Sequence, residues 1–375
     1  MTDWNMSIFD DIVLSSGQQV IMNMLRDGKT QTEIAKELGK ATGTIGNQVK
    51  VIRQKATTTS GTSILQDPNT GEKKLIWVKN KYSEDAKARL NQSILEEIKS
   101  SLPKIKPSKA PKKANSELMN CFVITDFHLG LLAHKEETHD ADWDLKKGEQ
   151  LLYDWFIAAI ESAPNADYAV FAQMGDFMHW DGLDAVTPAS KHVLDADSRF
   201  HKLVRAAIRV IRRIITELLK QYKHVYCYMM DANHDPASGV WLREFLSAMY
   251  EDEKRITVDL NPNPYACLEF GKVALFFHHG HKRKVANIDT VFAGMYRDVF
   301  GRTKHSYAHL GHIHSVEAKE TNLMIVEQHR TLAPADAYAA RGGWISGRDA
   351  KVITYHHEFG EVARLTISPD MVYNG

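Results

Sequence analysis

Long apolar runs are missing from this sequence of 375 residues. It contains no stretch of about 18 consecutive apolar residues, the length that a transmembrane helix needs. The N-terminal segment MTDWNMSIFDDIVLSS has no basic residues ahead of an apolar block, so it lacks the pattern of a secretory signal. We therefore expect a cytoplasmic protein that does not enter a membrane.

Cysteine is also scarce. The three cysteines, Cys121, Cys227 and Cys267, are far apart and lie in apolar stretches such as NCFVIT. This odd number and wide spacing exclude a disulfide framework and a cysteine-based zinc site. We expect three small buried side chains in a reducing compartment.

Neither sign of charge is in excess, because 47 basic residues balance 47 acidic ones. The balance hides an asymmetry, since residues 1–117 carry 19 Lys and Arg against 13 Asp and Glu, and residues 118–375 carry 28 against 34. All 18 histidines lie in the second part. The chain therefore joins a basic front end to a histidine-rich body.

A proline- and lysine-rich segment separates the two parts. Residues 103–117 read PKIKPSKAPKKANSE and hold three prolines and five lysines with hardly an apolar side chain. Such a composition cannot bury enough surface to fold and favours an extended chain. We expect a front domain at 1–102, a basic linker at 103–117 and a main domain at 118–375.

The front end predicts three short helices between residues 15 and 56. Apolar positions recur at helical spacing in all three, Thr30 or Gln31 opens the second, Gly39 permits a tight turn, and Thr42 can cap the third. This is the pattern of a helix-turn-helix. Residues 62–80 then alternate around DPNTGE like the hairpin of a winged domain, and Ser83 can cap a trailing helix.

The third of these helices predicts DNA binding. Its outward positions carry short, amide or basic side chains that suit base edges and phosphates in a major groove. They are Thr42, Gly43, Thr44, Asn47, Gln48, Lys50 and Arg53. The segment resembles bacterial and phage helix-turn-helix domains, although trihelical units of this kind also mediate protein contacts.

The second part alternates short apolar runs with helical patterns. We expect strands at 119–125, 168–175, 224–231, 264–270, 272–277, 307–310, 323–328, 352–358 and 361–367, and helices at 145–162, 196–222, 240–250 and 286–299. The early strands are separated by helices and predict parallel βαβ units, whereas the later ones follow each other as hairpins do. Open α/β sheets place their chemistry at the carboxyl ends of parallel strands.

Metal-binding side chains follow five of these apolar runs. They are Asp126 and His128, Asp176 and His179, Asn233 with His234 and Asp235, His278 with His279 and His281, and His312 with His314. One such group is easily an accident, but five in order at the ends of apolar runs indicate one converging site. Carboxylate, imidazole and amide ligands without thiolate suit manganese, iron, zinc or nickel.

In these motifs the sequence closely resembles the calcineurin-like metallophosphoesterase superfamily, whose signature is Asp-x-His, Gly-Asp, Gly-Asn-His, His and Gly-His-x-His. The resemblance covers residues 118–375 and implies a four-layer α/β/β/α sandwich with two divalent ions, manganese being our first choice. It implies that Asp126, His128, Asp176 and His314 hold one metal, and that Asp176, Asn233, His279 and His312 hold the other, with Asp176 as the bridge. A hydroxide shared by two such ions attacks a phosphoester at neutral pH.

The same resemblance implies roles for the neighbouring side chains. His234 would act as the general acid, Asp235 would hold its other ring nitrogen, and His179 would lie near the scissile bond, as in the bacterial SbcD-type nuclease branch. Asp235 alternatively caps a turn before Pro236. Ala232 departs from the usual glycine, and His278 or His281 can replace His279 as the ligand.

Three functions remain open at this point. The first is a metal-dependent phosphodiesterase, in particular a DNA nuclease of phage or prophage type that its front end delivers to DNA. The second is a phosphoesterase for small molecules or phosphoproteins, and the third is a DNA-binding regulator with a non-hydrolytic metal site. The loop with Trp180, Asp181 and Lys191 is either a lid or a plain connection, and the oligomeric state stays open, a dimer being possible.

Overall fold

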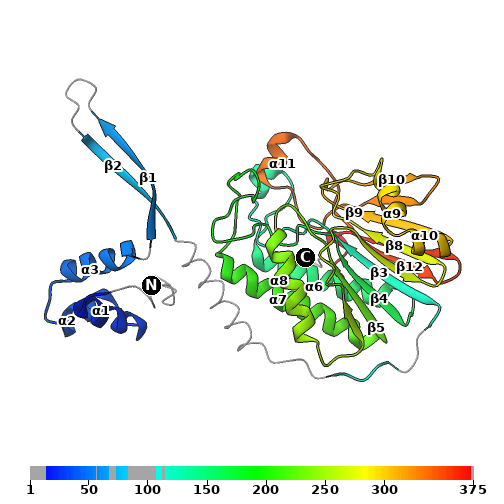
Figure 1. Cartoon of the computed structure of the whole chain (residues 1–375), viewed down its shortest axis with the longest axis horizontal. Coiled ribbons are helices and arrows are strands. Elements are labelled where there is room, and N and C mark those ends of the chain that lie inside the picture. The colour runs from blue at the N-terminus through cyan, green and yellow to red at the C-terminus, as the bar shows by residue number, and fades with distance from the viewer. Residues whose placement is uncertain (1–13, 56, 67–72, 83–106, 112–114, 373–375) are drawn as a thin grey trace. The chain divides into compact units, whose positions relative to one another are not determined.

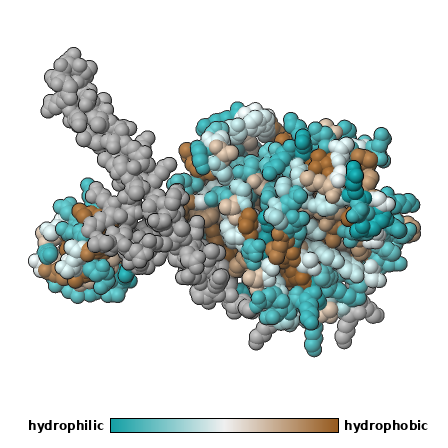
Figure 2. Space-filling view, in the orientation of Figure 1, coloured by the Kyte–Doolittle hydropathy of each residue, from teal (hydrophilic) through white to brown (hydrophobic). Residues whose placement is uncertain are grey.

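The computed structural model of the chain describes residues 14–55, 57–66, 73–82, 107–111 and 115–372. For residues 53–82 this description covers the backbone only. The chain divides into two compact units, Met1–Pro103 and Lys104–Gly375, which we describe separately (Figure 1). No helix in the described ranges is long and apolar enough to cross a bilayer. The face of the larger unit in Figure 2 is mainly hydrophilic, with its brown side chains in small groups.

The first unit contains the three expected helices, α1 (Ser16–Arg26), α2 (Gln31–Glu37) and α3 (Thr42–Lys55). Thr30 caps α2 in a reciprocal capping box with Glu33, which confirms the predicted start. Gly39 takes a φ of +60° in the turn before α3. The capping role expected for Thr42 is wrong, because α3 already begins there and the Ala41 carbonyl accepts its first hydrogen bonds.

The helices of the first unit enclose one small apolar core. Its buried members are Ile21, Met22, Met24, Ile34, Ala35, Ile45, Val49 and Ile52. The predicted hairpin is also present, with β1 (Thr57–Gln66) antiparallel to β2 (Lys73–Tyr82). The turn between these strands and the helix predicted at 83–102 lie outside the described residues.

The described part of the expected linker is attached to the larger unit. The Ser108 amide donates to the Glu253 carboxylate at 2.9 Å, and the Ser108 hydroxyl bonds Arg255. Nearer the first strand, the Asn115 carbonyl accepts from the Asp167 amide at 2.8 Å. The described residues of the expected linker are therefore hydrogen-bonded to the larger unit and do not form an unattached linker.

The larger unit is built on two facing sheets. The six-stranded sheet has the order β13 (Gly360–Ile367), β12 (Ala350–His356), β3 (Leu118–Ile124), β4 (Tyr168–Gln173), β5 (His224–Met229), β6 (Ile256–Val258). The five-stranded sheet has the order β10 (Glu317–Glu320), β11 (Ile325–Gln328), β9 (His305–Leu310), β8 (Val273–Phe277), β7 (Ala266–Phe270). The run from β3 to β6 is parallel, as are β8, β9 and β11.

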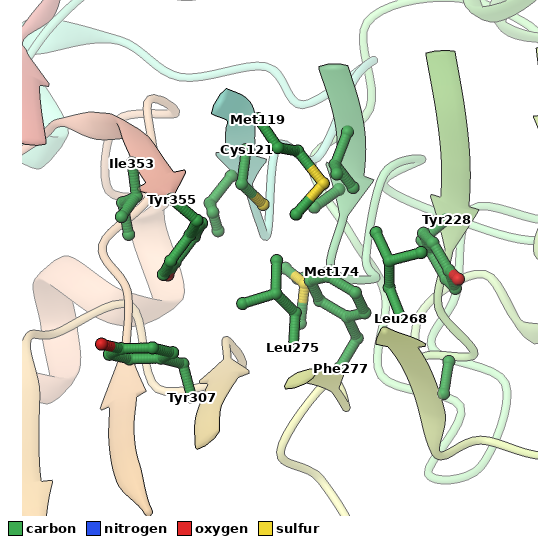
Figure 3. Packing of buried hydrophobic residues seen from close by; sticks show 14 of the residues in the cluster. Met119, Cys121, Met174, Tyr228, Leu268, Leu275, Phe277, Tyr307, Ile353 and Tyr355 are labelled. Atoms are coloured by element: carbon green, nitrogen blue, oxygen red, sulfur yellow. The ribbon is translucent and has the colours of Figure 1, made fainter. Parts of the chain in front are cut away.

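Apolar side chains from both sheets meet in the layer between them (Figure 3). Cys121 of β3 and Tyr355 of β12 come from the larger sheet, and Leu275 and Phe277 of β8 come from the smaller one. Burial raises the pKa of the Cys121 thiol far above its ordinary value. Cys121 and Cys227 are buried and Cys267 is half-buried, and all three are free thiols, as the sequence predicted.

Helices cover the outer faces of both sheets. Over the larger sheet they are α6 (Leu145–Ser162), α7 (Phe200–Gln221) and α8 (Pro236–Met249), and over the smaller one α9 (Ile288–Met295) and α10 (Arg297–Arg302). The short helices α5 (Lys135–Thr138) and α11 (Ala337–Gly342) contact each other away from the sheets (Figure 1), and a 3-10 turn follows at Pro369–Met371. Phe156 of α6 lies 5.6 Å from Phe122 of β3, and Phe292 of α9 lies 4.9 Å from Phe276 of β8, between ring centroids. The four-layer α/β/β/α sandwich is therefore confirmed.

Several elements differ from the expected pattern, among them the helices α5 and α11, which were not expected. The helix expected at 286–299 is divided at Tyr296 (φ −114°, ψ 44°) into α9 and α10. The short strands β6 and β10 were not expected. All four residues of β10 are exposed, so this strand has no apolar alternation that a sequence could reveal.

Candidate metal centre

The five motifs converge at one edge of the sandwich. Asp126, Asp176 and Asn233 follow the carboxyl ends of the parallel strands β3, β4 and β5, while His279 and His312 follow β8 and β9. The loops are also tied together, because the Asp126 amide donates to the Gly175 carbonyl at 3.0 Å. Parallel pairing thus brings side chains from distant segments to the same edge.

The backbone is unusual at these positions. Eight non-glycine residues in the described ranges have positive φ, and five of them are expected ligands. These five are Asp126, His128, Asp176, His312 and His314, with φ of 51°, 46°, 49°, 78° and 57°. Such conformations cost energy and persist where the surroundings enforce them, often at functional sites.

The first group of donors is formed by Asp126, His128 and His314, whose ligand atoms lie within 4.8 Å of one another. Asp126 Oδ1 lies 3.2 Å from His314 Nε2, and it is buried with no hydrogen-bond donor among the residues described. The other oxygen, Oδ2, accepts from the His312 amide at 2.8 Å and from the Thr125 hydroxyl. One oxygen is therefore fixed by the protein while the other faces the imidazoles.

The second group of donors is formed by Asp176, His279 and His312, again within 4.8 Å. His279 Nε2 lies 3.2 Å from Asp176 Oδ2 and 3.0 Å from Asn233 Oδ1. The opposite ring atom, Nδ1, donates to the Met174 carbonyl at 2.9 Å, which directs Nε2 toward the other donors. The two groups adjoin, since His279 Nε2 is 3.9 Å from Asp126 Oδ1.

The buried charges of these groups call for positive charge. Burial disfavours the charged Asp126 carboxylate, but His314 and His279 outweigh this effect and hold its pKa below the ordinary value. His279 in turn has its pKa raised to about 9 against its burial, chiefly by Asp176 and Asp126. A proton on the ring is one source of the missing charge, and a divalent cation is the other.

The donor set fits divalent cations on geometric and chemical grounds. Atoms that ligate such a cation at about 2.0–2.2 Å lie about 3.0–3.4 Å from one another. The donor pairs around Asp126 and Asp176 are separated by 3.0 to 3.2 Å. Carboxylate, imidazole and amide oxygen donors suit manganese, iron, zinc or nickel equally.

Two glycines give the donors the room they need. A Cβ on Gly175 (φ +107°) would lie 2.7 Å from His279 Nδ1 and 2.8 Å from the Cβ of Ala232. A Cβ on Gly311 would lie 2.6 Å from Asp126 Oδ2. The absent side chain of Gly175 therefore leaves space for Ala232 next to Asn233.

His234 lies beside the first group of donors but belongs to neither of the two groups. Its ring centroid is 4.7 Å from that of His128, and its Nδ1 is 3.2 Å from the His179 carbonyl. A carbonyl only accepts, so Nδ1 carries the proton in this contact and Nε2 remains for proton exchange.

The position of Asp235 corrects the sequence-based expectation. Its carboxylate accepts from the Met178 amide at 2.8 Å, so it fixes the loop after β4, and the His179 carbonyl takes the place expected for it at His234. Burial, together with the charge of Asp176, raises the pKa of Asp235 well above its ordinary value. Asp235 occupies the N-cap position of α8, yet its side chain does not cap that helix.

His179 lies behind His128, with 3.3 Å between their Nδ1 atoms. Burial first, and then the charge of His234, lowers the pKa of His179 to about 3. Its Nε2 is buried and has no hydrogen-bond partner among the described residues. His179 therefore lies close to both His128 and His234, and the ligand atoms of these three residues form a further cluster within 4.8 Å of one another.

The first two residues of the loop after His179 are packed against the rest of the larger unit. Trp180 is 1% exposed, and Asp181 caps α8 by accepting from the amides of Ala237 at 2.7 Å and Ser238 at 2.8 Å. These two residues fit the interpretation of a plain connection, and Lys191, farther along the same loop, is exposed. The sequence did not reveal this cap, because its partners lie 56 and 57 residues apart.

Neither alternative to His279 belongs to the described groups whose ligand atoms lie within 4.8 Å of one another. His278 points away, with Nδ1 2.9 Å from the Pro264 carbonyl and its ring stacked on Tyr265. The His281 ring lies 5.3 Å from that of His279. A supporting residue that the motifs did not reveal is Thr331, whose hydroxyl donates to the Asp126 carbonyl at 2.7 Å.

Comparisons with known proteins give only distant similarities. No family model and no curated protein matches the chain. The chain is similar to a Streptococcus pneumoniae protein described as a predicted phosphoesterase, at 11% identity and a TM-score of 0.30, over 69% of this chain and 94% of that one. It is similar to an archaeal phosphodiesterase at 12% and 0.32, over 66% and 100%, and to Entamoeba histolytica Vps29 in complex with zinc at 12% and 0.26, over 67% and 99%. Similarities this weak carry no conclusion about function, which has to rest on the site itself.

Proposed function

We propose that the protein is a metal-dependent phosphodiesterase, and in particular a nuclease that acts on DNA. The carrying observation is the pair of adjoining donor groups, joined by the 3.9 Å separation of His279 Nε2 and Asp126 Oδ1. Two adjoining cation sites are the arrangement that phosphatases and nucleases use for in-line displacement at phosphorus. The resemblance of the five motifs to the metallophosphoesterase signature supports the same reaction class.

The residues that would hold the cations follow from the two groups. Asp126, His128 and His314 would hold one, Asn233, His279 and His312 the other, and Asp176 would bridge them. Bound divalent cations supply Lewis acidity and activate water at neutral pH. The protein contributes orientation, because the amides of Asn233 and His234 donate to Asp176 Oδ1 at 3.1 and 2.8 Å and fix that carboxylate.

His234 is our choice for the proton donor to the leaving oxygen. The His179 carbonyl anchors its Nδ1, so a protonated ring can give up only the proton at Nε2. Asp235 has no part in this step and holds the loop after β4 through Met178. A diester is preferred over a monoester because His179 stands where protein phosphatases of the resembled superfamily carry a second aspartate, and the arginine that clamps a monoester in those enzymes is missing from this loop.

The first unit supplies the argument for DNA. Thr42, Thr44, Asn47 and Lys50 are exposed on α3, and all are short, amide or basic side chains. Gln48 is less available than expected, because it is half-buried and its Oε1 accepts from Gln18 at 3.2 Å. The side chain of Arg53 lies outside the described residues, so its expected role stays a prediction.

Parallel hydrolysis assays test this proposal. The parent would be assayed with Mn²⁺ on a nitrophenyl diester, a nitrophenyl monoester, and single-stranded and duplex DNA, beside Asp176→Ala and the matched control His224→Ala. We expect diester and DNA cleavage that Asp176→Ala abolishes and His224→Ala retains. Monoester turnover alone would favour the small-molecule or phosphoprotein alternative, and duplex binding without hydrolysis under any metal would favour a regulator.

A further inference from the structure

An exposed aromatic pair lies on α11 and the turn that follows it. Tyr338 and Trp344 are 64% and 59% exposed, and their ring centroids are 5.2 Å apart. Next to them, Ile345 is 95% exposed. Figure 1 shows α11 in orange, standing away from the two sheets. Large apolar side chains gathered at the surface in this way usually mark a binding site.

The turn holds the indole in a fixed position. Gly343 ends α11 with a φ of +71°, and the Trp344 amide donates to the Ala339 carbonyl at 3.1 Å. A Cβ on Gly342 would lie 2.9 Å from the Trp344 ring, so the indole packs directly on this glycine. The aromatic pair is therefore a preformed surface rather than a loose pair of side chains.

Hydrogen bonds connect this surface to the metal centre. The Ala335 amide, just before α11, donates to Asp140 at 3.0 Å in the segment that follows Asp126 and His128. Thr331, at the start of the same stretch, donates to the Asp126 carbonyl at 2.7 Å. The stretch that leads into α11 is therefore tied by hydrogen bonds to the segment that carries Asp126 and His128.

A basic tripeptide adjoins the second donor group. Lys282, Arg283 and Lys284 directly follow His281, are all exposed, and have no ion-pair partner among the described residues. The His281 ring lies 6.3 Å from that of His312. Unpaired cations beside a phosphodiester site provide an attractive field for a polyanion.

We propose that the aromatic pair stacks an unpaired nucleobase while Lys282–Lys284 bind phosphates of the same polynucleotide strand. Aromatic side chains beside unpaired cations are the chemistry that binds single-stranded nucleic acids, since every base offers a flat face. The unpaired cations argue against a second copy of this chain as the occupant, because its own tripeptide would add like charge. The inference rests on the proposed function and extends it to single-stranded substrate.

Binding in EDTA separates this inference from hydrolysis. Tryptophan fluorescence and the anisotropy of labelled oligo(dT) and oligo(rU) would be measured with the full chain. We expect oligonucleotide to quench the parent, and Trp344→Phe to lose most of the quenching while it retains binding. Tyr338→Ala and Trp344→Ala should weaken binding about tenfold or more, and Lys282→Ala should lower the salt slope by about 0.7.

Two exposed residues away from the site serve as matched controls. Phe359→Ala removes a ring that is 68% exposed at the β12–β13 turn, and Lys304→Ala removes an exposed charge just before β9. Both should bind like the parent. Equal binding by parent, Tyr338→Ala and Trp344→Ala would overturn the inference, as would a parent dimer that these changes dissociate without affecting oligonucleotide binding. A parent that binds oligonucleotide yet hydrolyses no diester would instead refute only the proposed function.

Discussion

His279 Nε2 and Asp176 Oδ2 are held 3.2 Å apart by contacts on their far sides. The His279 ring is anchored at Nδ1 by the Met174 carbonyl, and the other Asp176 oxygen accepts from two backbone amides. Neither side chain is free to turn away, so the pair is prepared for a cation. Preorganisation of this kind is what separates a ligand pair from two side chains that merely meet.

Asp176→Asn should strongly reduce metal binding. The change keeps the shape of the side chain but removes the charge that would bridge the two metals in the proposed site, and we expect at least about 100-fold weaker affinity. Metal analysis after dialysis against Mn²⁺ measures this, with circular dichroism to check the fold. His224→Asn is a suitable control, because His224 bonds Thr257 at the opposite end of β5. Full metal content in Asp176→Asn would refute the bridging role.

His234→Gln should retain both metals and lose turnover. General acid catalysis contributes about 10²–10⁴-fold, and the loss should be largest for a DNA diester, whose leaving oxygen needs a proton. A nitrophenyl leaving group needs little protonation, so its hydrolysis should fall much less. Steady-state rates on both substrates provide the comparison. An equal fall on both would assign His234 to substrate positioning or metal binding.

Gly175→Ala should destabilise the loop after β4. The new Cβ would lie 2.7 Å from His279 Nδ1 at a φ of +107°, so both the contact and the backbone are unfavourable. We expect about 1–3 kcal/mol less free energy of unfolding, measured by chemical denaturation. Gly182→Ala, which meets nothing within 4 Å, is the matched control. Similar losses in both variants would contradict the close approach of His279.

Acid should weaken a second buried network, between β11 and β12. Burial opposes the charge of Glu327, but His329 and Lys351 outweigh it and lower the Glu327 pKa to about 2. A depressed carboxyl pKa stabilises the fold above the ordinary value of 4.5, and this stability is lost as the pH falls from about 4.5 toward 2. Arg364 also pairs with Glu327, at 2.7 Å.

Glu327→Gln tests this network. It leaves Lys351 without its charged partner, so we expect about 3–5 kcal/mol less stability at neutral pH and a flatter acid dependence. Denaturation midpoints between pH 2 and pH 7 provide the measurement. Glu358→Gln, in the turn after β12, should keep the acid dependence of the parent. If Glu327→Gln shows the parent's acid dependence, another carboxylate is responsible.

Lys50→Ala on α3 should weaken duplex binding over all sequences. Loss of one phosphate contact lowers the salt slope by about 0.9. Lys36→Ala on α2 removes an exposed charge from a different helix of the same unit and should leave the slope unchanged. Anisotropy titrations of duplex DNA at several salt concentrations compare the two. Equal slopes for both variants and the parent would move the DNA contact away from α3.

The sequence predicted those parts of the fold that local patterns control. The helix at 145–162 matches α6, because its apolar face is long and Asp144 caps it through the Lys147 amide at 2.8 Å. The helix expected at 286–299 divides at Tyr296, whose hydroxyl donates to the Tyr265 carbonyl and whose ring lies 6.0 Å from that of Phe276. The exposed strand β10 carries no periodic signal at all.

The convergence of the candidate ligands was also predictable, because parallel strands end at a common edge. The contacts behind those ligands were not. Asp235 bonds the Met178 amide across 57 residues, and Asp181 rather than Asp235 caps α8. Such partners depend on where loops meet in three dimensions, and no local spacing encodes them.

Anomalous diffraction from crystals soaked in Mn²⁺ tests the central claim most directly. The account predicts two peaks about 3.5–4 Å apart, one beside Asp126, His128 and His314, the other beside Asp176, His279 and His312. Collection on both sides of the manganese edge identifies the metal. No peak in this cluster after saturating soaks, with manganese only on surface carboxylates, would contradict the account.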